Sequence, residues 1–240
     1  MEGKGLYSRI KPHVADRAFY KHAFAVMAPI MFQQLITTLV NLVDNLQVGQ
    51  LGPQSIAGVG IANQFFFIYM LMLFGIAGGG GLYVAQFWGA KDGDGMKQAY
   101  RFMLIASLAV SITFMLGAFF GARWIIGFFT NDAGTISEGV DYLKVAVFTY
   151  IPMAFSVATA GSFRSIGQAK VAMLPSIVAV FVNTFFNYVF IFGNFGAPRM
   201  GVRGAALATI IARLVELAML YYAMSKETCP FGTRLARVFN

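Results

Sequence analysis

Charged residues are scarce in this chain. Only 12% of its 240 residues are Asp, Glu, Lys or Arg, against roughly 25% in a typical soluble domain. In contrast, 58% of the residues are hydrophobic and the mean hydropathy is +0.67. Such a chain cannot cover a soluble core with polar groups, so the composition predicts an integral membrane protein.

Residues that carry enzyme chemistry are also few. The single cysteine, Cys229, excludes a disulfide framework within the chain. His13 and His22 flank a basic N-terminal lead and are typical of surface residues rather than metal ligands. The sequence contains no HExxH, GxSxG or P-loop motif. We therefore expect no enzyme, no cofactor and no certain metal site.

Long apolar runs are abundant, and a helix needs roughly 20 such residues to cross a bilayer. The second run is too long for one straight span, so we expect tilt or a break at Gly78–Gly81. The sequence predicts an all-α integral membrane bundle with a lead at 1–21 and a tail at 225–240. Its six spans are 23–46, 56–88, 100–120, 142–163, 171–192 and 205–224.

The net charge of +8 follows the predicted topology. Six spans place both termini on one side, together with the loops at 91–101 and 164–170. Most Lys and Arg residues lie on that side, whereas the opposite side holds Arg123, Lys144, Arg199 and Arg203. Because basic residues favour the cytoplasmic side, we expect a multi-pass protein of the cell (inner) membrane with both termini cytoplasmic. Nucleic acid is not expected as a partner.

The first span carries a polar stripe. Its members are spaced by three or four residues and so share one helical face: Gln34, Thr37, Asn41 and Asp44. A carboxylate within a span costs at least about 2.5–3.5 kcal/mol and by default marks an ion or substrate pathway. Pro29 lies in the same helix, where its missing N–H allows a hinge.

Three further polar residues lie at the depth of Asp44. Asn187 of the fifth span and Thr209 of the sixth each lie about one turn from the outer end, and Asn183 lies one turn deeper. A carboxylate, two amides and a hydroxyl at one level form a candidate cation or proton site, with sodium as an alternative ligand. Taken singly, the two Asn residues and Thr209 also fit hydrogen bonds between helices.

Arg213 and Glu216 are opposite charges at i and i+3 in the sixth span. Such a pair is typical of mutual neutralisation within a membrane. Two interpretations remain open at this point. The pair is either a structural ion pair or part of a gate at the floor of a cavity.

Four stretches, in order along the chain, resemble the multidrug and toxic compound extrusion (MATE) family. They are NLVDNLQVGQLGPQSIAGVGIANQ (41–64), LYVAQFWGAKD (82–92), VNTFFNYVFIFGNFG (182–196) and MGVRGAALATIIARLVE (200–216). The resemblance implies secondary antiport that exports cationic amphipathic compounds in exchange for protons or sodium. It also implies a fold of twelve helices in two six-helix lobes around a V-shaped cavity, of which this chain resembles the N-terminal lobe.

The resemblance implies roles for particular residues. Asp44 falls where the family has the acid that couples cation binding to drug release, and Pro29 falls at the bend of that helix. Asn183, Asn187 and Thr209 fall at its polar partners, and Gln64 joins the first-span stripe among the cavity-lining candidates. Some members carry a second acid where this chain has Asn187, which favours a proton over tight sodium binding.

At 240 residues the chain is half of the usual transporter. We expect a fragment, or else a half that works with a second six-helix lobe or in a parallel homodimer, and we favour the fragment. Besides multidrug efflux, two hypotheses stay open. One is a lipid-linked oligosaccharide or polysaccharide flippase, and the other is a non-transporting membrane module that associates through Gly75 and Gly79.

Overall fold

The structure is a computed structural model that describes residues 17–225 together with Cys229 and Phe231. All regular elements in this part of the chain are helical. They are α2 (Arg17–Gly49), α3 (Pro53–Gly89), α4 (Gly93–Gly127), α5 (Ala133–Ala146), η2 (Val147–Thr149), α6 (Tyr150–Ser165), α7 (Ala169–Phe192), η3 (Asn194–Gly196) and α8 (Val202–Ser225).

Five helical segments within the described residues are long and apolar enough to cross a membrane. They are α3, α4, the continuous run Ala133–Ser165, α7 and α8. Helix α2 spans 33 residues, which exceeds the roughly 20 that a crossing needs. These lengths agree with the predicted all-α membrane bundle.

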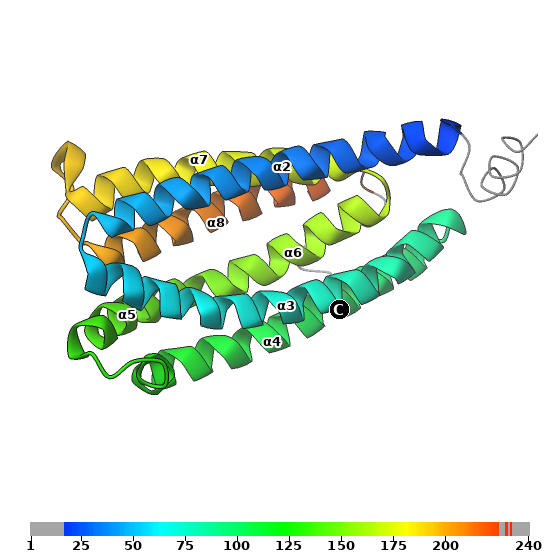
Figure 1. The fold of residues 1–240 in the computed structure, drawn as a ribbon. Coiled ribbons are helices and arrows are strands. Elements are labelled where there is room, and N and C mark those ends of the chain that lie inside the picture. Colours follow the sequence, from blue (N-terminus) through cyan, green and yellow to red (C-terminus); the bar gives the residue numbers. More distant parts are fainter. Residues whose placement is uncertain (1–16, 226–228, 230, 232–240) are drawn as a thin grey trace, which may run out of the picture.

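The helices form two layers that lie side by side (Figure 1). One layer contains α2, α7 and α8, and the other contains α3, α4 and α6. Helix α5 lies at one end of the molecule, where it packs against α3 and α8 and so joins the layers. We call this end, which also holds the α2–α3 and α7–α8 connections, the α5 end, and the opposite one the Phe231 end.

Local sequence signals fix several helix ends. Asp92 caps α4 by accepting hydrogen bonds from the backbone N–H groups of Asp94 and Gly95. Asp132 caps α5 by accepting from the N–H of Thr135 at 2.8 Å, a bond that lowers the pKa of this exposed carboxyl. Helix α7 ends at Gly193, whose positive φ of 78° suits glycine.

Of the two predicted alternatives, tilt or a break at Gly78–Gly81, the break is absent, because α3 is one helix from Pro53 to Gly89. These glycines instead permit close packing. A Cβ added at Gly80 would collide with the side chain of Met103, and one at Gly81 would lie 2.6 Å from Oγ of Ser165. Glycine therefore brings α3 against α4 and α6, while the helical hydrogen bonds continue through the segment.

Helix boundaries extend beyond the predicted spans. The predicted loop at 91–101 is mostly the first turns of α4, which begins at Gly93. The predicted fourth span at 142–163 is preceded by helix from Ala133, and it contains the short 3₁₀ turn η2. These turns contain polar residues, so a prediction based on hydropathy alone did not assign them to helices.

Two glycines set the contact between α3 and α5. A Cβ on Gly58 would lie 2.6 Å from the backbone N of Gly139 and 2.8 Å from the carbonyl O of Thr135. The helices can approach this closely only because both residues lack a side chain. This contact anchors α5 across the end of the bundle. By contrast, a Cβ on Gly75 or Gly79 would meet no atom of the described residues within 4 Å, so neither glycine mediates helix packing within this part of the chain.

The Phe231 end has its own buried cluster. Phe231 is fully buried, with its ring 5.5 Å from that of Tyr100 and 4.9 Å from that of Phe163. Met224 and Met103 belong to the same cluster. A residue beyond α8 is thereby packed between α4 and α6.

Candidate functional site

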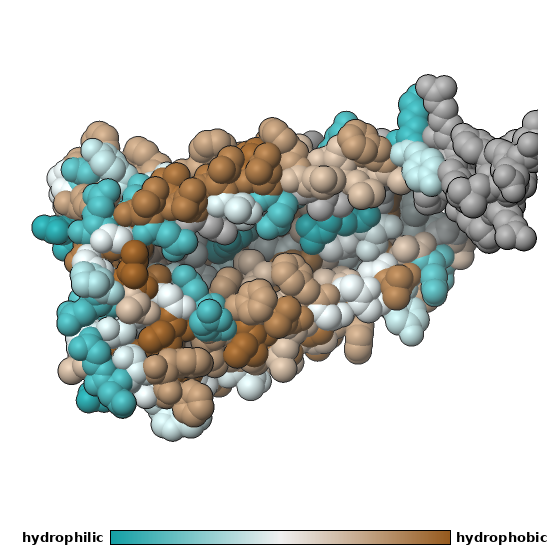
Figure 2. Space-filling view, viewed as in Figure 1, coloured by the Kyte–Doolittle hydropathy of each residue, from teal (hydrophilic) through white to brown (hydrophobic). Residues whose placement is uncertain are grey.

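A groove runs between the two layers. Figure 2 shows hydrophilic residues inside it and mostly hydrophobic residues on its rims. Within the groove lies a cavity of about 340 Å³, to which α2, α3, α5, η2, α6, α7 and α8 contribute residues. The described lining contains two charged side chains, Asp44 and Arg213. The remaining lining is a mixture of amide, hydroxyl, aromatic and aliphatic groups.

Helix α2 presents one face to this cavity. Thr37, Val40, Asp44 and Val48 are spaced by three or four residues, and all four line the cavity. The hydroxyl of Thr37 is bonded to the carbonyl of Gln33 at 2.9 Å, so it does not compete for the carboxylate. Asp44 is thus the acidic group on a helix face that is otherwise largely neutral.

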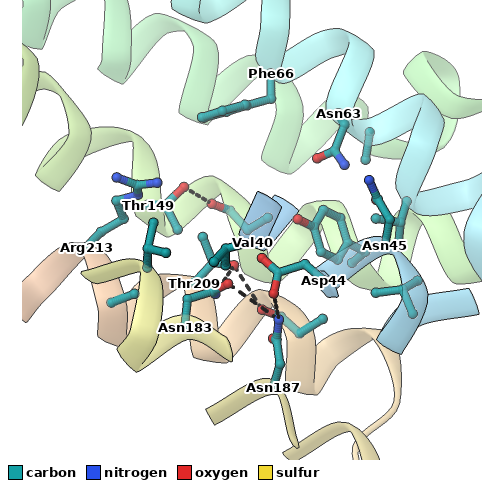
Figure 3. A pocket seen from close by; sticks show the side chains of 18 of the residues that line it. Val40, Asp44, Asn45, Asn63, Phe66, Thr149, Asn183, Asn187, Thr209 and Arg213 are labelled. Atoms are coloured by element: carbon teal, nitrogen blue, oxygen red, sulfur yellow. Dashed lines mark hydrogen bonds between the residues drawn. The ribbon is translucent and has the colours of Figure 1, made fainter. Parts of the chain in front are cut away.

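Asn187 of α7 holds the carboxylate of Asp44. Its Nδ2 donates to Oδ1 of Asp44 at 2.9 Å, and the residue is only 2% exposed (Figure 3). The hydroxyl of Thr184, one turn earlier on α7, donates to the carbonyl of Val180 at 3.2 Å. Hydrogen bonds to an ionised group are stronger than neutral ones, so α7 fixes the position of Asp44.

The side-chain amide of Asn183 can take two orientations next to Asp44. In one orientation of its amide, Nδ2 donates to Oγ1 of Thr209 at 3.1 Å. In the other, Nδ2 lies 2.6 Å from Oδ2 of Asp44, and Oδ1 accepts from the backbone N and Oγ1 of Thr209 at 3.2 and 3.1 Å. An ionised carboxylate requires a donor and favours the second orientation, whereas a protonated one can itself donate to Oδ1 in the first.

The same residues supply oxygens for a cation. Oδ1 of Asn187 is buried and has no hydrogen-bond partner. Asp44, Asn183, Asn187 and Thr209 all carry oxygen atoms, the ligand type that hard cations such as sodium prefer, although Asn187 presents its Nδ2 rather than its Oδ1 to Asp44. No group of three or more His, Cys, Asp or Glu residues gathers in the described part of the chain, so this chemistry does not suit zinc.

The predicted cavity-lining residues divide into three cases. Thr37 lines the cavity. Gln34 and Gln64 are exposed and are not among the residues that line this 340 Å³ cavity, and their predicted role stays a prediction. The side chains of Asn41 and of the predicted hinge Pro29 lie outside the described residues, although α2 is one continuous helix across position 29.

Sequence reasoning missed several lining residues. On α3, the lining positions are Val59, Ala62, Asn63 and Phe66, which share one helical face, and Gln64 points about 100° away from Asn63. This spacing was a usable signal, because Asn63 is the polar member of that face. The other missed lining groups include Asn45, Tyr142, Thr149 and Tyr150.

An aromatic wall lines the part of the cavity formed by α3 and α6. The rings of Tyr69 and Tyr150 stack at 4.4 Å with an interplanar angle of 8°, and Phe66 packs 5.8 Å from each. The hydroxyl of Tyr69 donates to the carbonyl of Tyr150 at 2.7 Å and lies 2.8 Å from Oγ of Ser111. These contacts hold Phe66 and Tyr150 in place at the cavity surface.

Arg213 and Glu216 pair as the sequence predicts. Nη1 of Arg213 lies 2.6 Å from Oε2 of Glu216. The hydroxyl of Ser176 on α7 donates to the other oxygen, Oε1, at 2.7 Å. Glu216 is buried, whereas Arg213 lines the cavity.

This fold and cavity define a class of protein, the polytopic helical membrane protein with a central polar cavity. Comparison with known proteins identifies the family within that class. A model of the MatE family matches residues 29–189. The chain belongs to the MatE family. Members of this family are transporters rather than enzymes.

Curated relatives include multidrug resistance proteins. The chain is 29% identical over 213 residues to the probable multidrug resistance protein NorM of Thermotoga maritima, covering 86% of this chain and 45% of that protein. It is 31% identical over 201 residues to the probable NorM of Burkholderia mallei, covering 83% and 41%. The chain thus spans less than half the length of the curated relatives that it matches.

Solved structures show the same architecture. A crystal structure of MATE in complex with MaL6 is similar with a TM-score of 0.82 at 25% identity, covering 92% of this chain and 48% of that one. An outward-facing multidrug resistance transporter of the MATE family gives a TM-score of 0.80 at 24% identity, over 91% and 48%. The arrangement of helices is therefore that of half a MATE transporter.

Proposed function

We propose that this chain is one lobe of a secondary active multidrug efflux antiporter, which exports cationic amphipathic organic compounds in exchange for protons or sodium. The observation that carries the proposal is the carboxylate of Asp44, held by Asn187 within a central cavity. A carboxylate in a spanning helix is costly and is retained where ions or substrates pass. The names of the curated relatives support the multidrug substrate class.

The cavity suits an amphipathic cation. Asp44 supplies negative charge on the α2 side, and Phe66 projects into the cavity from α3 (Figure 3). Aromatic faces attract cations by roughly 0.5–2 kcal/mol in addition to the hydrophobic contact that they offer. A flat organic cation can place its charge near Asp44 and its apolar part against Phe66 and Tyr150.

Coupling follows from competition for one carboxylate. An ionised Asp44 attracts the organic cation, and protonation removes that attraction. The side-chain amide of Asn183 can hydrogen-bond to either protonation state of Asp44, because a rotation of the amide exchanges the positions of Nδ2 and Oδ1. Sodium would instead use the oxygens of Asp44, Asn183, Asn187 and Thr209. The amide at position 187 adds no second negative charge, which favours the proton.

Release of the substrate requires a conformational change of the protein as well as the loss of charge on Asp44. In the proposed cycle, the substrate enters from the cytoplasm or inner leaflet, and protonation of Asp44 from outside lets α2 rearrange at Pro29. The protein lies in the cell (inner) membrane with both termini cytoplasmic, which makes the α5 end the outer end. A second six-helix lobe, or a second copy of the chain, completes the transport pathway.

A lipid-linked oligosaccharide or polysaccharide flippase is the second candidate. Such a protein needs cationic groups in its cavity to hold a pyrophosphate. Among the described lining residues, the one cationic side chain is Arg213, and Glu216 neutralises it. This lining favours a cationic substrate over an anionic one.

The test reconstitutes the chain in proteoliposomes and records ethidium transport after a pH jump, with the mass of the embedded assembly measured in the same preparation. The variants are Asp44→Asn and the control Asp94→Asn, which removes an exposed acid paired with Lys97 at the Phe231 end. If the embedded assembly is a dimer, we expect it to transport ethidium, with transport reduced at least about tenfold by Asp44→Asn and nearly unchanged by Asp94→Asn. A monomer without transport would assign the chain to a larger two-lobe protein, in which Asp44→Asn must have the same effect. Transport that is indifferent to Asp44→Asn overturns the proposal.

A further inference from the structure

Arg213 is a cation inside a cavity that we propose to bind cations. It lines the cavity together with Asp44, and its charge acts on the Asp44 carboxylate. Its side chain is 27% exposed, so the guanidinium is partly free of packing constraints. Arg213 carries the same sign of charge as the proposed substrate and lines the same cavity, so it can compete with the substrate for the carboxylate of Asp44.

Glu216 restrains that arginine. Oε2 of Glu216 lies 2.6 Å from Nη1 of Arg213, and the carboxylate side chain is only 5% exposed. Glu216 does not line the cavity, so it is not a contact for the substrate. The carboxylate of Glu216 therefore acts on Arg213 rather than on a molecule in the cavity.

Ser176 orients Glu216 from the neighbouring helix. Its hydroxyl donates to Oε1 at 2.7 Å, which leaves Oε2 for Arg213. Arg164 on α6 is a second cation whose charge interacts with that of Glu216. Glu216 therefore keeps a compensating charge nearby even if Arg213 is replaced.

We propose that Glu216, oriented by Ser176, holds Arg213 away from Asp44 and so keeps the Asp44 carboxylate available to the transported cation. Glu216 is thus a positioning residue, and the inference rests on the function proposed above. Without Glu216, the Arg213 guanidinium is free to pair with Asp44 within the same cavity. A mobile side chain would then occupy the site that the substrate needs.

Other titratable groups surround these residues, and none of them replaces Glu216. Tyr142 on α5 and Tyr150 on α6 are neutral at physiological pH and line the cavity. Helix α7 contributes the uncharged Ser176 and Asn183 to this region. The titratable and charged groups that face the Arg213 region within the described residues are Asp44 (α2), Tyr142 (α5), Tyr150 and Arg164 (α6) and Glu216 (α8).

The test measures ethidium binding to the chain in lipid nanodiscs as a function of pH. Compared with wild type, we expect Glu216→Gln to weaken binding at pH 7.5 at least about tenfold. The double variant Arg213→Gln/Glu216→Gln should restore the affinity to within about threefold of wild type. Ser176→Ala, which keeps both charges, should weaken binding in the same direction by a smaller factor. Such rescue is not expected of an ion pair that merely stabilises the fold.

A second measurement needs no ligand. Infrared difference spectra of each variant against its Asp44→Asn partner follow the Asp44 carboxylate directly. A guanidinium that moves onto Asp44 stabilises the ionised form, so in Glu216→Gln the carboxylate band should persist to lower pH than in wild type. In the double variant the band should return to the wild-type profile. If Glu216→Gln does not fold, Ser176→Ala provides both comparisons.

The outcomes separate the two proposals. Ethidium binding that is lost in Asp44→Asn but unchanged in Glu216→Gln, with an unchanged carboxylate band, overturns the role of Glu216 alone. A double variant as weak as Glu216→Gln also overturns it. Binding that is indifferent to Asp44→Asn overturns the proposed function, and the infrared comparison then decides whether Glu216 restrains Arg213.

Discussion

The amide nitrogen of Asn187 lies 2.9 Å from Oδ1 of Asp44, which joins α7 to α2 at the cavity. The two residues are 143 positions apart in sequence. Their bond fixes the position of Asp44, the one carboxylate among the described lining residues, beside Asn183. It is also the contact on which the proposed cation site depends most directly.

Replacing Asn187 with Leu should destabilise the protein by about 1.5–3 kcal/mol, because a buried charged group loses a hydrogen bond. Unfolding in mixed micelles measures the change in free energy. In an Asp44→Asn background the cost of Asn187→Leu should be smaller, since no charge remains to be stabilised. Equal costs in the two backgrounds would contradict the assigned contact.

Gly58→Ala should destabilise the protein by about 1–3 kcal/mol, because the new Cβ overlaps the backbone of α5 at Gly139. The matched control is Gly60→Ala on the same helix, where a Cβ meets no atom within 4 Å. The control should be neutral or slightly stabilising, since Ala favours helix over Gly. Thermal unfolding of both variants in detergent measures the difference, and equal midpoints would refute the close contact.

Phe231→Ala should cost about 3–5 kcal/mol, because the ring is fully buried between Tyr100 and Phe163. Phe120→Ala provides the comparison, since Phe120 is 82% exposed and its loss leaves no internal cavity. Limited proteolysis beyond α8 should accelerate in Phe231→Ala and stay at the wild-type rate in Phe120→Ala. If both variants are cleaved at the wild-type rate, Phe231 does not anchor this segment.

Tyr69→Phe should cost about 1–2 kcal/mol, because the hydroxyl bonds both the carbonyl of Tyr150 and Oγ of Ser111. Tyr83→Phe is the control, since the Tyr83 side chain is 60% exposed. The loss should also weaken ethidium binding, because the aromatic wall then lacks its anchor. Unfolding and binding measured on the same preparations report the two effects separately.

Much of the site could be predicted from the sequence because depth in a membrane can be counted. A helix rises 1.5 Å per residue, so spans whose direction alternates along the chain are predicted to place Asp44, Asn183, Asn187 and Thr209 at about one level. The structure brings these four together through the bonds of Asn187 and the amide of Asn183. Their role in coupling remains a prediction.

Rotation about each helix axis was harder to predict than depth. On α3 the cavity is lined by Asn63, whereas the neighbouring Gln64 is not among its lining residues. A membrane helix has apolar neighbours on its lipid side and in its packed core alike, so hydropathy gives little sign of its rotation.

Glycine positions were hard to interpret for a related reason. Gly75 and Gly79 match the small-xxx-small pattern, yet Cβ atoms added there would meet no atom within 4 Å. The close contact instead joins Gly58 of α3 to Gly139 of α5. Because the chain has 26 glycines, only the pairing of helices in space identifies the two that meet.

The central claim is that a proton and an organic cation compete for Asp44, and equilibrium binding of ethidium across pH 5–9 tests it most directly. For the wild-type chain in nanodiscs, affinity should fall as pH decreases, by up to about tenfold per pH unit below the midpoint, because one proton displaces one cation. Asp44→Asn should bind weakly at every pH, and Asp94→Asn should follow the wild-type curve. An ethidium affinity that does not change with pH, or one that Asp44→Asn leaves intact, would contradict the account.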